Sequence, residues 1–311
     1  MTFFNGGVFS LNLVKYEIYL QAIKTGTTLE TTLSNATLSA IIHSKGAELV
    51  SLKNTKGRAY IWGGNSEFWG KHSPILFPIV GTLKGNHYRY NNQKYQLPRH
   101  GFARDMPFEL IEKTDSKVTF SLKASTETKI IYPFDFELQI SYTLEENGLS
   151  VGYKIFNATN ESMPFSIGAH PAFALPETFE SYTLAFEFNE ELKSYILEND
   201  LLSDNSFKVI LHKNKLPLTY SLFENDALIF KEIQSKRITL LENEKPILTI
   251  HYSDFKNFGI WTKINAPFIC LEPWLGYSDT YESSGNINEK EGIQFVGANS
   301  AFLCTFKIEI L

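Results

Sequence analysis

The sequence predicts an all-β protein built as an antiparallel β-sandwich. Apolar and polar residues alternate with a period of two through most of the chain from Leu33 onward. Turn-forming residues separate these runs, and convincing amphipathic helices are nearly absent. Short strands that follow one another without intervening helices favour a sandwich over βαβ units.

The clearest single element is a β-hairpin near the middle of the chain. Residues 136–144 alternate, residues 145–148 read Glu-Glu-Asn-Gly, and residues 149–156 alternate again. An Asn-Gly pair between two alternating runs is a strong hairpin signal. Further strands are expected at residues 118–122, 182–188, 227–230, 237–241, 247–252, 258–262, 268–272 and 302–310.

The chain is long enough for one large domain. It has 311 residues, of which 43% are hydrophobic and 14% aromatic. No boundary separates residues 33–311, which we expect to form a single β-sandwich domain. Residues 1–32 are irregular, and their Thr-rich piece at 25–28 resembles a linker, so we expect an N-terminal extension there.

Composition excludes several classes of partner. The net charge of −5 is spread along the chain, and no basic stripe could neutralise a nucleic-acid backbone. No stretch approaches the ~18 apolar residues of a membrane span. Residues 1–8 show no basic, apolar pattern, so we expect no signal peptide. Cys270 and Cys304 lie in apolar runs and are expected to be free thiols in a reducing compartment. We therefore expect a cytoplasmic protein, either a monomer or a weak homodimer.

Three short segments place ionisable residues next to Gly or Pro in apolar surroundings, where a loop of fixed conformation can orient a side chain. The first segment contains His100 and Arg104, the second contains His170, and the third contains Glu272 and Trp274. Taken singly, each of these residues has an ordinary structural explanation. Together, two imidazoles, a carboxylate and an indole suit a sugar, whose C–H face stacks on aromatic rings and whose hydroxyls need polar partners.

At these residues the chain resembles the aldose 1-epimerase (galactose mutarotase-like) family, and within it the LacX-like and hexose-6-phosphate epimerase-like branch. The matching stretches include Gly46-Ala47-Glu48, His100-Gly101-Phe102 and Leu271-Glu272-Pro273-Trp274. The resemblance extends over residues 33–311 and keeps the family's order of motifs, whose stretches are 46–52, 74–81, 100–105, 132–134, 165–173 and 271–276.

The resemblance implies a β-supersandwich that binds a sugar in a groove without metal or cofactor. It implies that His100 is the first active-site histidine, His170 the general acid and Glu272 the general base. Asp226 matches an aspartate that holds sugar hydroxyls, although its flanking residues equally suit a structural turn. Trp274 would supply an aromatic surface next to Glu272.

The sequence departs from the family at two positions. Thr82 stands where family members usually carry an Arg that reaches the sugar, and Arg99 stands where Gln is common. Arg99 or Lys84 could supply the missing positive donor; otherwise the substrate preference has shifted or the activity is reduced. Arg104 is retained, to orient substrate or to support His100.

The sequence thus predicts an aldose 1-epimerase that interconverts the anomers of a hexose. One alternative is a hexose-6-phosphate 1-epimerase, because Arg99, Arg104 and Lys84 could bind phosphate. Another is a non-catalytic carbohydrate-binding protein, and a polysaccharide-processing enzyme would need a second carboxylate. Metal and serine chemistry find little support. The remaining histidines show no ligand spacing, and Ser166 lacks the Gly-x-Ser-x-Gly elbow.

Overall fold

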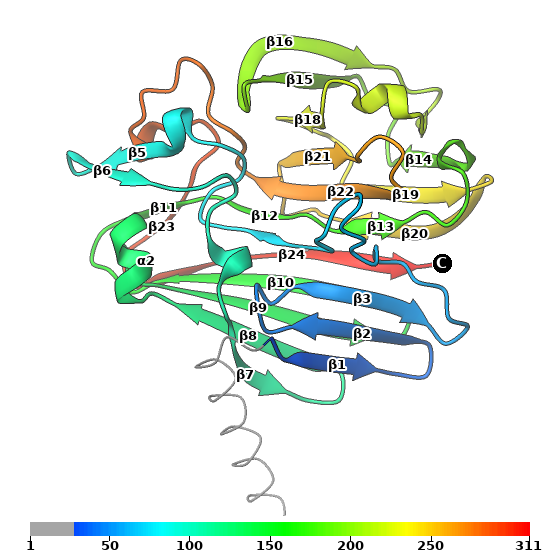
Figure 1. The fold of residues 1–311 in the computed structure, drawn as a ribbon, viewed down its shortest axis with the longest axis horizontal. Helices are drawn as coiled ribbons and strands as arrows, with labels where there is room; N and C mark the ends of the chain where they lie inside the picture. The colour runs from blue at the N-terminus through cyan, green and yellow to red at the C-terminus, as the bar shows by residue number, and fades with distance from the viewer. Residues whose placement is uncertain (1–27) are drawn as a thin grey trace, which may run out of the picture.

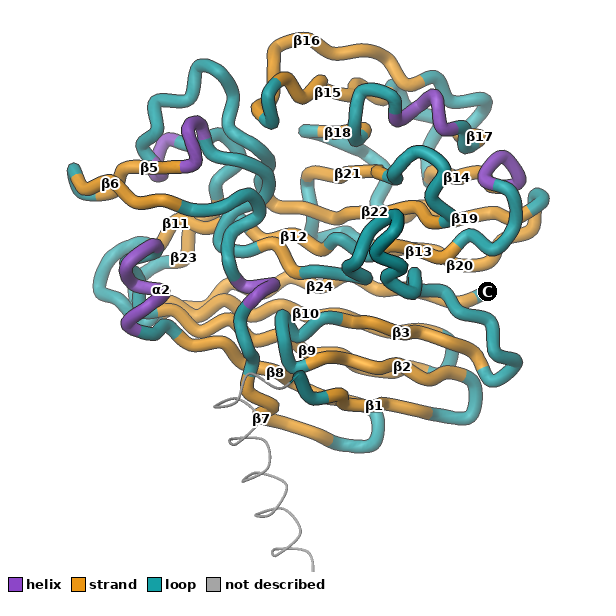
Figure 2. The backbone as a smooth tube through the Cα atoms, viewed as in Figure 1, coloured by secondary structure: helices purple, strands orange, loops and turns teal. Residues whose placement is uncertain are grey.

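Two large antiparallel sheets pack face to face in the computed structural model, which describes residues 28–311 (Figure 1). One sheet has nine strands and the other eight. Nearly every connection joins antiparallel strands, and Figure 2 shows how little helix lies between them. The predicted all-β antiparallel sandwich is therefore confirmed.

The nine-stranded sheet is built around the longest strands of the molecule. Its clearest pair, β9 and β10, is the predicted hairpin, with Glu145 paired to Gly148 across the turn. In spatial order the sheet contains β17 (Lys215–Pro217), β14 (Tyr182–Phe186), β19 (Arg237–Glu242), β20 (Lys245–His251), β24 (Ser300–Ile310), β10 (Gly148–Asn157), β9 (Phe136–Glu145), β8 (Lys117–Lys123) and β7 (Glu109–Lys113).

The eight-stranded sheet is centred on β22, in which every residue is buried. A strand buried on both faces needs cover on each side, and only one side faces the other sheet. The strands are, in order, β16 (Leu201–Val209), β15 (Leu192–Glu198), β18 (Leu228–Phe230), β21 (Asn257–Trp261), β22 (Phe268–Leu275), β12 (Ile167–Ala169) and β4 (Ile75–Leu76), with β13 (Ala172–Ala174) also paired to β22.

Three short sheets complete the fold. A three-stranded sheet, β1 (Glu30–Ser34), β2 (Leu38–His43) and β3 (Leu49–Asn54), lies against the nine-stranded sheet (Figure 1). The Tyr142 hydroxyl of β9 donates to the carbonyl of Ala47 at 2.7 Å and ties the two together. The remaining pairs are β5 (His87–Tyr90) with β6 (Gln93–Gln96), and β11 (Met163–Phe165) with β23 (Gln294–Val296).

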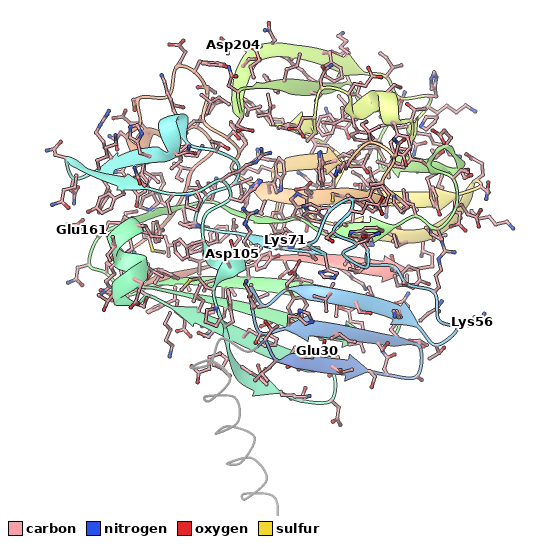
Figure 3. The ribbon with its side chains drawn as sticks, viewed as in Figure 1. Glu30, Lys56, Lys71, Asp105, Glu161 and Asp204 are labelled. Carbon is pink, nitrogen blue, oxygen red and sulfur yellow. The ribbon has the colours of Figure 1, made fainter. Side chains whose placement is uncertain are left out.

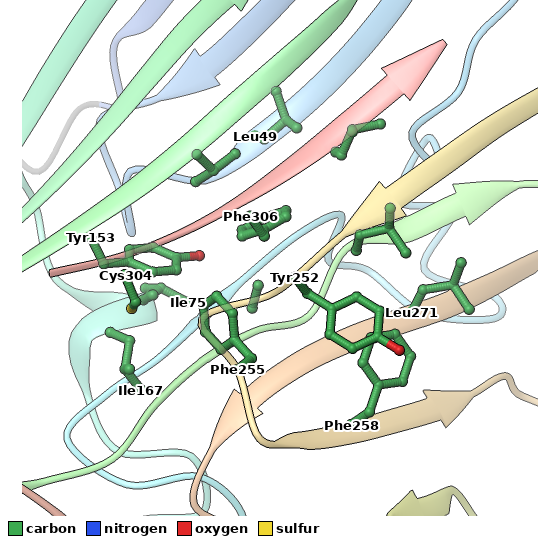
Figure 4. Packing of buried hydrophobic residues seen from close by; sticks show 14 of the residues in the cluster. Leu49, Ile75, Tyr153, Ile167, Tyr252, Phe255, Phe258, Leu271, Cys304 and Phe306 are labelled. Carbon is green, nitrogen blue, oxygen red and sulfur yellow. The ribbon is translucent and has the colours of Figure 1, made fainter. Parts of the chain in front are cut away.

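The main core fills the space between the two large sheets. Figure 4 shows Leu271 and Phe258 of the eight-stranded sheet on one side and Phe306 and Tyr153 of the nine-stranded sheet on the other. Because side chains alternate along a strand, residues next to Leu271 must point away from this core. Cys270 and Glu272 therefore face outward from the sandwich on the opposite side of β22.

Helical structure is limited to short connections. The one α-helix described, α2 (Thr126–Ile131), begins with a capping box in which Ser125 and Thr128 exchange hydrogen bonds. Single 3-10 turns are η1 (Lys84–Asn86), η2 (Ala103–Asp105), η3 (Phe179–Ser181), η4 (Tyr220–Phe223) and η5 (Ile287–Glu289). Among residues 28–311 there is no helix long and apolar enough to cross a membrane.

Two sequence expectations meet the structure differently. Strand β22 continues to Leu275, three residues past the expected end at Glu272, because Pro273 pairs opposite Phe258 and Trp274 opposite Asn257. The expected N-terminal extension lies mostly outside the described residues. Its boundary between residues 32 and 33 falls within β1.

Candidate active site

A cavity of about 340 Å³ opens on the face of the eight-stranded sheet that is turned away from the core. Strands β21 and β22 form its floor, and loops from distant parts of the chain form its walls. Every site residue expected from the sequence lines it: His100, His170, Glu272, Asp226, Arg104, Arg99 and Trp274.

Glu272 lies at the centre of the floor and is only 1% exposed. Burial raises the pKa of its carboxyl well above the usual value; Arg99 opposes this shift, and the charge of Asp226 adds to it. Its Oε2 atom has no hydrogen-bond partner among the described residues. A carboxyl in this setting readily holds a proton.

His170 stands beside Glu272, in the connection between β12 and β13. Its Nε2 atom lies 3.4 Å from Glu272 Oε1. This separation suits an ion pair, yet burial lowers the pKa of His170 to about 3 and so favours the neutral ring. The two observations agree if the pair holds one proton in common, because neutral imidazole with carboxylic acid contains as many protons as imidazolium with carboxylate.

Two tryptophans that the sequence did not single out surround the His170 ring. Trp69 stacks on it with centroids 4.8 Å apart and an interplanar angle of 26°, and Trp261 meets it edge-on at 5.7 Å. Both line the cavity. Trp261 closes the predicted strand at 258–262, but Trp69 lies in an irregular segment where no periodicity marks it.

His100 is fixed by an unusual backbone conformation and by its ring. Its φ is +66°, and its Nδ1 accepts the backbone N–H of Gly81 at 3.0 Å. Burial, more than any neighbouring charge, lowers its pKa well below the usual value and favours the neutral ring. Arg99 Nε donates to the other ring nitrogen, Nε2, at 3.2 Å. A neutral imidazole accepts at only one nitrogen, so the Gly81 and Arg99 donors compete for the ring.

The two arginines form one wall of the cavity mouth. Arg99 Nη1 binds Asp200 Oδ1 at 2.7 Å, at the tip of the β15–β16 hairpin, and Arg104 Nη2 donates to the Arg99 carbonyl at 3.0 Å. Lys84, the other candidate for the missing donor, does not line the cavity; its Nζ donates to the carbonyl of Tyr281. Thr82 is buried, and its backbone N–H binds Ser278 Oγ.

Trp274 and Asp226 complete the lining. The Trp274 indole lies over the backbone of two glycines on the neighbouring strands, and a Cβ at Gly168 or Gly259 would come within 2.6 or 2.4 Å of it. Only 6% of Trp274 is exposed, so it is mainly a packed wall. Asp226 has a φ of +76° just before β18. Its negative charge lies near enough to Glu272 to raise the pKa of the Glu272 carboxyl.

An antiparallel supersandwich with an acid–base and aromatic cavity over one sheet is the architecture of galactose mutarotase-like proteins. The chain belongs to the aldose 1-epimerase family, whose model matches residues 30–288. Members of this family are isomerases that act on carbohydrates.

Individual relatives agree with this assignment. The plasmid-encoded protein LacX of Lactococcus lactis subsp. lactis is 36% identical over 272 residues, which cover 83% of this chain and 91% of LacX. The galactose mutarotase related enzyme of Lactobacillus acidophilus superposes with a TM-score of 0.86 at 30% identity, covering 91% of this chain and 97% of that one. A galactose mutarotase-like protein of Lactobacillus casei ATCC 334 gives 0.86 at 32%, covering 91% and 100%.

Proposed function

We propose that this protein interconverts the α and β anomers of a hexose by acid–base ring opening and closure. Glu272 removes the proton from the C1 hydroxyl, and His170 protonates the ring oxygen. The observation that carries the proposal is the 3.4 Å separation of His170 Nε2 and Glu272 Oε1 inside a cavity of about 340 Å³.

The short separation follows from the chemistry. The C1 hydroxyl oxygen and the ring oxygen are bonded to the same carbon, so a base and an acid that reach both must themselves be close together. After ring opening, rotation about C1–C2 presents the other face of the aldehyde, and the same two groups return their protons. Each group of this kind contributes about 10²–10⁴-fold to the rate.

The shared proton supports the same cycle. Imidazolium with carboxylate is the form that opens the ring, and neutral imidazole with carboxylic acid is the form that remains while the sugar is open. Burial raises the pKa of Glu272 and lowers that of His170 to about 3, so it favours neutral imidazole with carboxylic acid over the ion pair. Because the pair holds the same single proton in both forms, the reaction can run in either direction.

The remaining lining residues suit a sugar ring. Arg99 and His100 line the cavity as polar partners for a sugar oxygen, and Asp226 offers an acceptor to hydroxyls. Trp69 and Trp261 give the cavity an aromatic side against which C–H groups pack.

The test is an anomerisation assay by polarimetry with glucose, galactose and glucose 6-phosphate. The wild-type protein should accelerate the approach to equilibrium, and Glu272→Gln should lose about 10²–10⁴-fold of that acceleration while it remains folded. Glu244→Gln, on the exposed turn between β19 and β20, is the matched control and should behave as wild type. A folded Glu272→Gln protein with near-wild-type rates would refute the assignment. Sugar binding without acceleration by the wild-type protein would favour a carbohydrate-binding role instead.

A hexose 6-phosphate is a second candidate substrate because Arg99 and Arg104 both line the cavity and guanidinium groups bind phosphate well. The Asp200 carboxylate argues against a phosphorylated substrate, because it already pairs with Arg99. A clear preference for glucose 6-phosphate over glucose would support the phosphate candidate, and equal or lower rates would reject it.

A further inference from the structure

Three chemically different donors meet at the inner end of the cavity. They are His170, Cys270 and Glu272, whose nitrogen, sulfur and oxygen atoms all lie within 4.8 Å of one another. Cys270 and Glu272 are next-but-one neighbours on β22 and therefore share its outward face. We propose that this cluster binds a thiophilic divalent cation such as Zn²⁺ or Cd²⁺, which then inhibits the enzyme.

The spacing suits such an ion. At ordinary Zn–N, Zn–O and Zn–S lengths, tetrahedral donors stand roughly 3.3–3.8 Å apart. His170 Nε2 and Glu272 Oε1 already meet this requirement at 3.4 Å. The Cys270 sulfur lies within 4.8 Å of the other two donors, so it must move by up to roughly 1.3 Å to reach tetrahedral spacing.

Charge balance also favours the site. Glu272 and Cys270 as anions, with a neutral His170, cancel the two positive charges of the ion, so the buried complex carries no net charge. The cation replaces one proton shared by His170 and Glu272 and one thiol proton, and both protons leave to solvent.

A second observation points to a missing ligand. Glu272 Oε2, the carboxylate oxygen that does not face His170, is buried and has no hydrogen-bond partner among the described residues, so it is free to bind the ion together with Oε1. The ion reaches the cluster through the cavity, where His170 and Glu272 are lining residues. Cys270 is fully buried behind them and contacts the ion from the sheet side.

The cation displaces the catalytic proton, so inhibition rests on the proposed function, whereas cation binding does not. The experiment is a Cd²⁺ titration of the full chain, followed by the ultraviolet thiolate-to-cadmium absorption band and, in parallel, by anomerisation. The wild-type protein should show a band that saturates at one equivalent and a matching loss of activity.

The chain offers a matched pair of variants because it has only two cysteines, both buried. Cys304→Ala should keep the band and the inhibition. Cys270→Ala should lose the band, and its half-inhibitory Cd²⁺ concentration should rise about tenfold or more. No band in either the wild-type protein or Cys304→Ala overturns the proposal.

A band that persists in Cys270→Ala also overturns it. The decision does not depend on the folding of that variant, because Cys270 is the only thiol left in Cys304→Ala. If the wild-type protein shows no anomerisation, the proposed function fails while the absorption band still decides the cation site.

Discussion

His100 and Asp226 each hold a left-handed backbone conformation at the edge of the cavity. Their φ values are +66° and +76°. Such a conformation costs a non-glycine residue roughly 1–2 kcal/mol, and Asp and Asn tolerate it best. Residues held this way cluster at functional sites, because the surrounding structure fixes the direction of the side chain.

Substitutions at Asp226 can therefore distinguish a structural role in the turn from a role in binding sugar. Asp226→Asn should fold with wild-type stability but bind sugar more weakly, because the amide keeps the backbone preference and loses the negative charge. Asp226→Ala should lose about 1 kcal/mol of stability in addition. Urea unfolding and KM measure the two effects. A KM for Asp226→Asn equal to that of the wild-type protein would leave Asp226 with a turn role only.

The shared proton of His170 and Glu272 predicts a broad pH profile. The pair gains a second proton only when pH falls toward the lowered pKa of His170, about 3, and loses its single proton only above the raised pKa of Glu272. Between these limits the pair holds one proton and remains active. The enzymatic rate, corrected for spontaneous anomerisation, should therefore stay constant as pH falls from 7 to 5. A fall that follows an ordinary histidine near 6.5 would contradict this.

At the scale of elements, hydrogen bonds fix the segment from Trp62 to Ser73, which carries Trp69 against the His170 ring. The Trp62 indole N–H donates to the Trp69 carbonyl at 2.9 Å, and Lys263 Nζ donates to the carbonyls of Glu67 and Phe68. Glu48 Oε1 accepts the backbone N–H groups of His72 and Ser73.

An ion pair also fixes the segment from Trp62 to Ser73. Figure 3 shows Lys71 and Asp105 near each other, and their side chains pair at 3.2 Å. The position of this segment affects His170 because His170 Nδ1 has no hydrogen-bond partner within residues 28–311. The ring is therefore oriented by stacking on Trp69 and by the contact of its Nε2 with Glu272.

Removing the stacking partner should reduce kcat more than it raises KM. Trp69→Leu should lower kcat about ten- to hundredfold, because the imidazole is no longer held in line with the ring oxygen. Trp69→Phe keeps an aromatic face and should recover most of the rate. Steady-state kinetics with both variants tests the idea, and equal rates for Leu and Phe would show that stacking does not position His170.

At the scale of the whole molecule, one buried ion pair connects the parts that carry the cavity walls. Lys290 Nζ lies 3.0 Å from Asp279 Oδ1 and donates to the Tyr277 carbonyl at 2.6 Å. Asp279 Oδ2 accepts the backbone N–H of Lys84, and the Asp279 carbonyl accepts that of Leu202. The segment after β22, the segment after β4 and strand β16 are thus joined at one residue, Asp279, through its carboxylate and its backbone carbonyl.

Breaking this pair should destabilise the fold strongly. Lys290→Met leaves the Asp279 carboxylate buried without its cation, which should cost about 3–5 kcal/mol of unfolding free energy. Lys215→Met removes the cation of the exposed Lys215–Glu244 pair and should cost only about 0–1 kcal/mol. Urea unfolding compares them, and similar costs would mean that Asp279 is not a structural junction.

The sequence by itself determined the period-two pattern, the β9–β10 hairpin and the motifs around His100, His170 and Glu272. These features are local: side-chain alternation, turn chemistry and unusual residue strings are present in the chain before it folds. Tertiary structure alone decided that Trp69 lies on His170, that Asp200 neutralises Arg99 and that His170 lies beside Cys270 and Glu272. Such contacts join residues far apart along the chain or hidden on one side of a strand, and only the packing of sheets and loops fixes their distances.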